Sequence, residues 1–138
     1  MHPFHIALTV HDLAAAERFY NGSLGCREGR RAATWIDYDL AGHQVSLHLD
    51  PDKQVERFEN PVDGKQVPVP HFGLVLPMQE WRELAARLTA AGTAFVIEPY
   101  LRFEGQVGEQ GTMFLLDPSG NALEFKGFAL QEDLFSSG

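Results

Sequence analysis

The sequence predicts an α+β fold in which a βαβββ module occurs twice, with mixed sheets and with helices on their outer faces. Three observations support this. Each half of the chain reads as a strand, a helix and three further strands, each first strand carries a histidine, and a glycine opens each last strand. The 138 residues form one domain, with modules at 1–50 and 70–128, a linker loop at 51–69 and a tail at 129–138.

The first module begins with a strand at residues 4–10, where apolar and polar side chains alternate and His5 lies on the less apolar face. Asp12 then provides a helix N-cap, followed by apolar residues at helical spacing. This helix is expected to end near Gly22 or Gly25. Three more strands are expected at 26–31, 34–40 and 42–49.

The segment between the modules is polar, has no sustained periodicity and is rich in proline. Its prolines are Pro51, Pro61, Pro68 and Pro70. It therefore reads as a loop, and a loop of about twenty residues is expected to be functional or mobile.

The second module repeats the order of the first. A strand at 70–76 carries His71, and a helix containing Trp81 stops at Gly92. The remaining strands are expected at 95–103, 113–116 and 122–128. The sequence Asp-Pro-Ser-Gly at 117–120 fits a turn, so the last two of these strands form a hairpin.

Glu124 is unusual within the last strand. It lies between Leu123 and Phe125, and the two-residue alternation puts it on the opposite face from both. A carboxylate in this position is explained either by a solvated outer face or by a partner. The other polar residues of the two modules favour a partner.

Aligning the modules superimposes His5 on His71. Side-by-side modules would bring the polar positions of their first and last strands together, so that His5, His71 and Glu124 converge. Ser46 or His48 would join them from the first module. Two imidazoles and one carboxylate suit a facial metal site with open positions, although each histidine taken alone is better explained by a hydrogen-bonded or exposed ring.

Composition excludes several classes of function. A formal charge of −8 without a basic cluster argues against nucleic acid as a partner. The chain has no apolar run long enough to span a membrane and no leader sequence, so a cytoplasmic protein is expected. A single cysteine excludes an internal disulfide.

Together these features resemble the vicinal oxygen chelate superfamily of glyoxalases, bleomycin resistance proteins and extradiol dioxygenases. The resemblance rests on the paired modules, the Asp12-to-Gly25 run, the turn at 117–121 and the placement of the two strand histidines and Glu124. It covers residues 3–128. It implies that eight strands curl around a central cavity and that His5, His71 and Glu124 bind a divalent metal there.

One departure from this family affects the expected reaction. Glyoxalase I members usually supply a fourth ligand, a carboxylate, from the last strand of the first module, where this chain has Ser46 or His48. Three ligands with open positions favour an Fe(II) dioxygenase that acts on a catechol- or enediol-like small molecule. Mn(II), Ni(II) or Zn(II), with lyase, isomerase or thiol-transferase chemistry, is the alternative, and a metal-free drug-binding protein is a third.

Two residues are predicted to take part in catalysis. His48 faces the expected cavity and suits a fourth ligand or a general base, or it is a hydrogen-bonded wall residue. Tyr100 lies on or beside the strands that precede the Glu124 hairpin, together with Arg102 and Gln110. These residues would contact an anionic or phenolic substrate, and the alternative is that they are surface positions. The resemblance also implies a homodimer.

Overall fold

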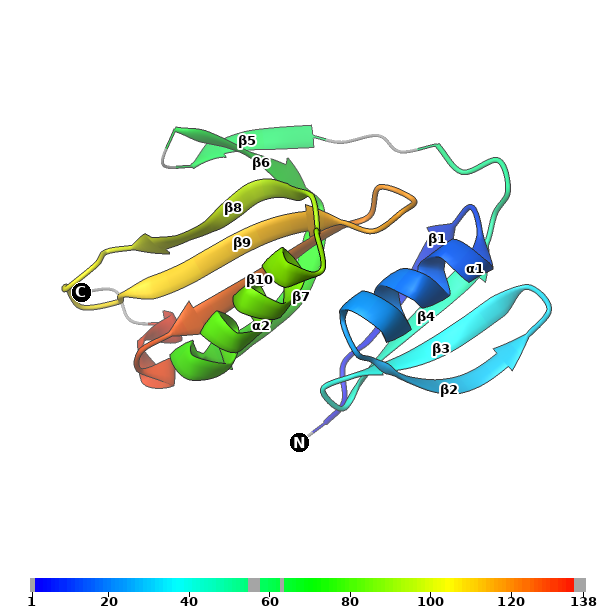
Figure 1. The fold of residues 1–138 in the computed structure, drawn as a ribbon, viewed down its shortest axis with the longest axis horizontal. Helices are drawn as coiled ribbons and strands as arrows, with labels where there is room; N and C mark the ends of the chain where they lie inside the picture. The colour runs from blue at the N-terminus through cyan, green and yellow to red at the C-terminus, as the bar shows by residue number, and fades with distance from the viewer. Residues whose placement is uncertain (1, 55–57, 63, 136–138) are drawn as a thin grey trace. The chain divides into compact units, whose positions relative to one another are not determined.

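The computed structural model describes residues 2–54, 58–62 and 64–135 and contains two βαβββ modules, each with a four-stranded mixed sheet (Figure 1). By its internal contacts the chain divides into two compact units. The N-terminal unit comprises residues 1–56 and 117–121, and the C-terminal unit comprises residues 57–116 and 122–138. The predicted α+β class and the repeated module are confirmed.

The N-terminal unit has one sheet with the strand order β1-β4-β3-β2. β1 runs parallel to β4, and the other neighbours are antiparallel. Its elements are β1 (His5–Val10), α1 (Leu13–Glu17), the π-helix η1 (Arg18–Ser23), β2 (Arg27–Ala32), β3 (Trp35–Leu40) and β4 (His43–Leu49).

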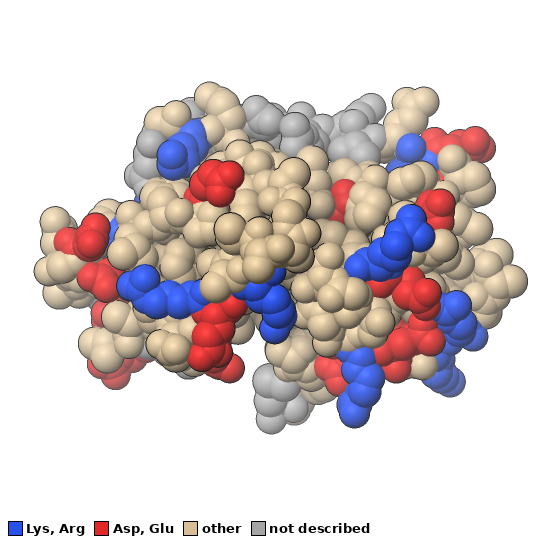
Figure 2. All heavy atoms as spheres, in the orientation of Figure 1, with Lys and Arg blue, Asp and Glu red and all other residues tan. Residues whose placement is uncertain are grey.

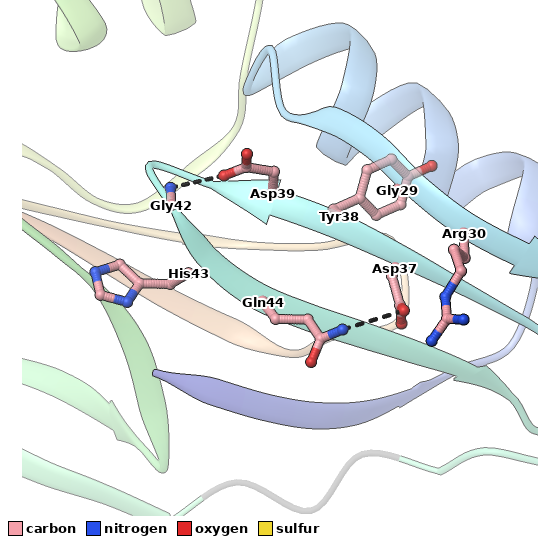
Figure 3. A pocket seen from close by; sticks show the side chains of 8 residues that line it. All are labelled: Gly29, Arg30, Asp37, Tyr38, Asp39, Gly42, His43 and Gln44. Carbon is pink, nitrogen blue, oxygen red and sulfur yellow. Dashed lines mark hydrogen bonds between the residues drawn. The ribbon is translucent and has the colours of Figure 1, made fainter. Parts of the chain in front are cut away.

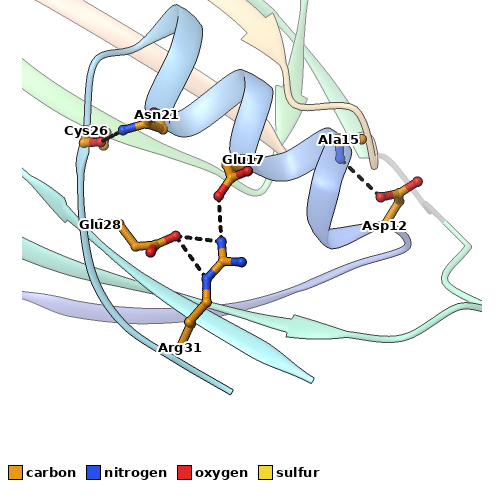
Figure 4. Close-up of polar contacts among 7 residues, drawn as sticks. All are labelled: Asp12, Ala15, Glu17, Asn21, Cys26, Glu28 and Arg31. Atoms are coloured by element: carbon orange, nitrogen blue, oxygen red, sulfur yellow. Dashed lines mark hydrogen bonds and ion pairs between the residues drawn. The ribbon is translucent and has the colours of Figure 1, made fainter. Parts of the chain in front are cut away.

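The first helix is anchored at both ends. The Asp12 side chain accepts a hydrogen bond from the Ala15 backbone N–H at 3.1 Å, which confirms the predicted N-cap (Figure 4). The α-helix gives way to a π-helical turn, whose Tyr20 ring stacks on Tyr38 of β3 at 5.8 Å between ring centroids. On its outer side, the guanidinium of Arg31 pairs with both Glu17 and Glu28 at 2.6 Å (Figure 4).

The turn that joins β9 to β10 belongs to the N-terminal unit. Buried Asp117 organises it by accepting backbone hydrogen bonds from Ser119 and Asn121 and one from the hydroxyl of Tyr20 at 2.8 Å. The His11 backbone N–H donates to the Ser119 hydroxyl. The predicted turn is therefore confirmed, and its side chains stabilise the N-terminal unit.

The C-terminal unit combines a four-stranded sheet, in the order β7-β10-β9-β8, with a two-stranded sheet, β5-β6. β10 runs parallel to β7 and antiparallel to β9. Its elements are β5 (Phe58–Val62), β6 (Lys65–Val69), β7 (His71–Pro77), α2 (Met78–Ala90), β8 (Phe95–Arg102), β9 (Gln110–Leu116), β10 (Ala122–Phe128) and the 3₁₀ helix η2 (Gln131–Phe135).

Helix α2 covers one face of the larger sheet (Figure 1), and Trp81 is its main contact. The indole lies against Gly111 and Gly127, where an added Cβ atom would come within 2.7 and 2.6 Å of the ring. Its Nε1–H donates to the Phe125 carbonyl at 2.8 Å. The two glycines therefore let helix and sheet approach closely, and the opposite sheet face carries Glu124.

The expectation of a loop at 51–69 is wrong, because this segment contains the antiparallel strands β5 and β6. Proline lacks an N–H donor and suits strands at a sheet edge, and both strands of a two-stranded sheet are edges. Residues 55–57 and 63 of the expected loop lie outside the described residues.

Figure 2 shows acidic and basic side chains interspersed over the face in view. No helix in the described part of the chain is both long and apolar enough to cross a membrane.

Candidate functional site

The C-terminal unit brings two of the predicted ligands together. His71 opens β7 and lies opposite Ala122 of β10, so Glu124 lies two residues further along on the same face. The His71 Nε2 atom is 3.1 Å from Glu124 Oε1. Only 12% of the Glu124 side chain is exposed, so the carboxylate lies at a recessed position rather than on a solvated outer face.

Two further contacts fix the orientation of this pair. The Nδ1 atom of His71 lies 2.7 Å from the Pro68 carbonyl oxygen, which only accepts hydrogen bonds, so Nδ1 carries a proton and donates it. The Thr112 hydroxyl donates to Glu124 Oε2 at 2.5 Å. With the Nδ1 proton held by Pro68, the contact between Nε2 and Oε1 is a hydrogen bond in which a protonated Nε2 donates to Oε1. Loss of the Nε2 proton would leave Nε2 and Oε1 as two electron-pair donors directed toward the same region.

The charges of the pair reinforce each other. The hydrogen bond to Glu124 raises the pKa of His71, although burial of the ring opposes this. Burial raises the pKa of Glu124, but hydrogen bonds from His71 and Thr112 outweigh it and leave this pKa below its ordinary value. Glu124 is therefore ionised near neutral pH, as a metal ligand requires.

An aromatic ring from an apolar cluster lies against one side of the pair. The ring of Phe114 contacts the His71 ring edge-on, with centroids 5.0 Å apart. Phe114 also belongs to a buried cluster with Val67 of β6 and Ile97 of β8. The hairpin β5-β6, which the sequence analysis did not predict, therefore supplies part of the wall of this site.

The predicted wall residues lie on the same sheet face as Glu124. Tyr100 is in register with Thr112, and Arg102 is in register with Gln110. Tyr100 packs against the buried cluster, and the Lys65 ammonium lies 4.8 Å from the centroid of its ring. Gln110 is only 9% exposed, so it is not a surface residue, which is the alternative for these three positions.

The N-terminal unit carries the third predicted ligand in a polar network. His5 Nδ1 and Gln44 Oε1 lie 2.7 Å apart across β1 and β4. Gln44 then donates to Asp37 at 3.2 Å, and Asp37 accepts a second hydrogen bond from Ser46 at 2.6 Å. Asp37, which the sequence analysis missed, thus places a carboxylate next to Ser46.

Strand register decides between Ser46 and His48 as the counterpart of Glu124. His5 lies opposite Gln44 in the first module, and His71 lies opposite Ala122 in the second. Moving two residues along each last strand leads to Ser46 and to Glu124. His48 lies two residues beyond Ser46 on β4, opposite Thr9 of β1, and its side chain is exposed.

A pocket of about 230 Å³ lies on the N-terminal unit beside this network (Figure 3). Asp37 and Gln44 line it and face each other across β3 and β4. Asp39, also at its edge, accepts a hydrogen bond from the Gly42 backbone N–H at 2.6 Å (Figure 3). The carboxylates of Asp37 and Asp39 are therefore engaged in hydrogen bonds within the β3–β4 hairpin.

Within either unit, the described residues contain no group of three or more His, Cys, Asp or Glu side chains arranged to hold a metal ion. His71 and Glu124 provide two donors, and His5 belongs to the other unit. The remaining described histidines include two with structural contacts, because His11 is 2.6 Å from the Ser119 hydroxyl and His43 accepts the Phe4 N–H.

The supporting residues Thr112 and Asp37 were not predicted as part of a site. Both follow from strand alternation once register is known, because each is a polar residue on the same face as a predicted site residue. The Pro68 carbonyl gives no signal in the sequence, because any residue supplies a backbone carbonyl.

The structure has two βαβββ modules, and its His–Glu pair lies on the sheet face opposite α2. Paired modules of this kind define the class of proteins to which the vicinal oxygen chelate enzymes belong. A family model described as the Glyoxalase/Bleomycin resistance protein/Dioxygenase superfamily matches residues 2–125. The chain belongs to this superfamily. A search of curated proteins found no match.

Solved structures agree with this assignment. The chain is similar to a glyoxalase/bleomycin resistance protein/dioxygenase from Alicyclobacillus acidocaldarius, with 32% identity, a TM-score of 0.80 and coverage of 97% of this chain and 96% of that one. A fosfomycin resistance protein from Listeria monocytogenes shares the fold at 20% identity and a TM-score of 0.70, with coverages of 96% and 97%. Lactoylglutathione lyase from Agrobacterium tumefaciens also shares the fold, at 19% identity and a TM-score of 0.67, with coverages of 98% of this chain and 96% of that one.

Proposed function

We propose that this protein is a divalent-metal-dependent enzyme, and specifically a non-haem Fe(II) dioxygenase that acts on a small catechol- or enediol-like substrate. The observation that carries the proposal is the His71–Glu124 pair at 3.1 Å, in which Pro68 orients the ring and Thr112 orients the carboxylate. Histidine ligands of metals usually donate their other ring N–H to a carbonyl or carboxylate in this way.

The proposed ligands are His5, His71 and Glu124. His71 and Glu124 fit a divalent metal because the Nε2 atom, once a metal displaces its proton, and the ionised carboxylate are directed toward the same point. His5 is added on the basis of the repeat, in which it corresponds to His71. When bound, the metal would supply open positions for two neighbouring substrate oxygens and for O₂. Mn(II), Ni(II) and Zn(II) are the other candidates.

The remaining residues would bind substrate and exclude water. Phe114 and its apolar cluster keep water from one side of the His–Glu pair. Tyr100 offers a phenol and an aromatic face beside Thr112, and His48 offers an imidazole, the side chain that most often serves as a general base. We propose these two as the catalytic side chains and a homodimer as the working assembly.

A second function is supported by Asp37. Its carboxylate, hydrogen-bonded to Ser46 at 2.6 Å, stands beside the strand from which glyoxalase members usually supply an additional carboxylate. A lyase, isomerase or thiol transferase that uses Ni(II), Zn(II) or Mn(II) is therefore the alternative. It differs from the dioxygenase in needing no oxygen.

The test is metal content after anaerobic purification of the untagged protein, together with Glu124→Ala. We expect about one iron per chain in the wild type and its loss in the variant, followed by oxygen uptake with catecholic compounds in air. Nickel, zinc or manganese in place of iron, with turnover unaffected by removing oxygen, would favour the alternative. A protein that takes up no divalent metal even when it is supplied would contradict both, and a drug-binding role would replace them.

A further inference from the structure

A second pocket, of about 340 Å³, opens on the N-terminal unit at the far end of β1 from His5. Its lining is formed by Ala7, Leu8, Thr9, His48, Lys53 and Asn121. The volume is at the lower end of the range of small-molecule sites. The metal proposal uses one of these residues, His48, but gives the pocket itself no ligand to bind.

Lys53 places a fixed positive charge at the pocket. Its ammonium donates to the Thr9 hydroxyl at 2.8 Å, so the side chain folds back over the end of β1 instead of extending into water. Thr9 is in register with His48 of β4, and both side chains are on the same face of the sheet. One ammonium, one hydroxyl and one imidazole therefore meet in a small area.

The lining holds no competing acid. None of its residues is Asp or Glu, in a chain whose formal charge is −8. Asn121 uses both side-chain N–H groups internally, one toward the Thr9 carbonyl and one toward Asp117. Asp50, in the adjacent loop, accepts the Asp52 N–H. The Lys53 ammonium thus keeps donors available for an anion, since an ammonium has three.

We propose that this pocket binds the carboxylate of a small organic acid. One lysine matches the single charge of a carboxylate, whereas the double charge of a phosphate is usually met by more cations or by a helix N-terminus. The Ala7 methyl group, on the same strand face as Thr9, gives the organic part of the ligand an apolar neighbour. The pocket belongs wholly to the N-terminal unit, so its binding does not depend on the proposed metal chemistry.

The pocket also has a consequence for the substrate. His5, Ala7 and Thr9 alternate along one face of β1, so Thr9, which holds the Lys53 ammonium, is about 13 Å along the strand from His5 at roughly 3.3 Å per residue. A ligand whose carboxylate contacts Lys53 would lie against His48, the proposed general base. If the proposed function is correct, its substrates carry a carboxylate remote from the vicinal oxygens.

The test is titration of the metal-free protein with benzoate, benzamide and inorganic phosphate. Binding is monitored by chemical shift changes of the backbone amides. Benzamide has the shape of benzoate without its charge. We expect saturable benzoate binding with changes centred on Thr9, His48 and Lys53, and at least about tenfold weaker binding of benzamide. Lys53→Gln should weaken benzoate binding by a similar factor, and Lys53→Arg should retain it.

Arg82→Gln is the matched control, because it removes one positive charge from an exposed position on α2. It should leave benzoate affinity unchanged. Equal binding of benzoate and benzamide, equal affinity in Lys53→Gln and the wild type, or the absence of saturable binding would overturn the proposal. Tighter binding of phosphate than of benzoate would also overturn it, in favour of a phosphate site. Because the protein is metal-free, these results are independent of the metal test.

Discussion

The orientation of single side chains decides what the His71–Glu124 pair can bind. A histidine with a free ring would rotate and lose its alignment with the carboxylate. Here the Pro68 carbonyl fixes both the ring and the tautomer, and the Thr112 hydroxyl fixes the carboxylate. The site is therefore preorganised before any metal arrives, which reduces the entropic cost of binding.

Replacing Thr112 by valine tests this preorganisation. The change keeps the branched shape but removes the hydroxyl that donates to Glu124 at 2.5 Å. We expect metal affinity to fall about 10- to 100-fold, the usual effect of losing a partner that orients a ligand. The measurement is Zn(II) affinity by competition with a chelating dye.

Thr89→Val is the matched control for Thr112→Val. The Thr89 hydroxyl also donates a hydrogen bond, to the Ala85 carbonyl, but it lies on the exposed side of α2. Zn(II) affinity should match the wild type in this variant. Unchanged affinity in Thr112→Val would show that Thr112 does not support a metal ligand.

Sequence reasoning could identify Glu124 because its chemistry contradicts its surroundings. A carboxylate between two large apolar residues in a strand signals a special environment, and the structure provides one. Thr112 carries no such signal, since threonine is common in strands. The sequence predicts the hairpin that pairs this strand with β10, but it starts the strand at 113, whereas β9 begins at Gln110. Thr112 therefore lies outside the predicted strand, and its register with β10 is not specified.

At the scale of elements, the hairpin β5-β6 was missed for a physical reason. Proline usually marks loops, and the segment contains Pro61 and Pro68. In this hairpin they occupy edge strands, where a missing N–H is tolerated. Burial of Val67 against Ile97 and Phe114 is a tertiary contact, so no local pattern predicts it.

The close approach of β7 and β10 depends on Gly73. It lies opposite Glu124, and a Cβ atom built at this glycine would overlap the Glu124 carbonyl oxygen. Gly73→Ala must therefore move one strand away from the other at the position of the site. We expect a loss of about 3 kcal/mol in the free energy of unfolding, the upper end of typical overpacking costs. Urea denaturation measures this.

Gly22→Ala is the comparison for Gly73→Ala. A Cβ atom at Gly22 has no neighbour within 4 Å, so the variant should be neutral or slightly more stable. If Gly73→Ala is as stable as Gly22→Ala, the two strands do not need to approach as closely as the structure indicates.

At the scale of the whole molecule, the proposed ligands are divided between the two units. His5 is in the N-terminal unit, while His71 and Glu124 are in the C-terminal unit. A metal bound by all three would link the stability of the units, because ligand binding stabilises whatever must be folded to form the site. A metal bound by the His–Glu pair alone would stabilise only the C-terminal unit directly.

The two tryptophans allow this difference to be measured. Trp35 belongs to the N-terminal unit and Trp81 to the C-terminal unit. Trp35→Phe leaves Trp81 as the sole reporter, and Trp81→Phe leaves Trp35. Each variant is compared with itself in the presence and absence of Zn(II), so a change in its basal stability does not affect the result.

We expect Zn(II) to stabilise both units. At a free Zn(II) concentration about 100 times the dissociation constant, each tryptophan should report an increase of about 2.7 kcal/mol in the free energy of unfolding by urea. Adding His5→Ala should remove the increase reported by Trp35, because the N-terminal unit then has no ligand for the metal. If Zn(II) stabilises the surroundings of Trp81 alone, and His5→Ala changes nothing, His5 is not a ligand and the metal site belongs to the C-terminal unit.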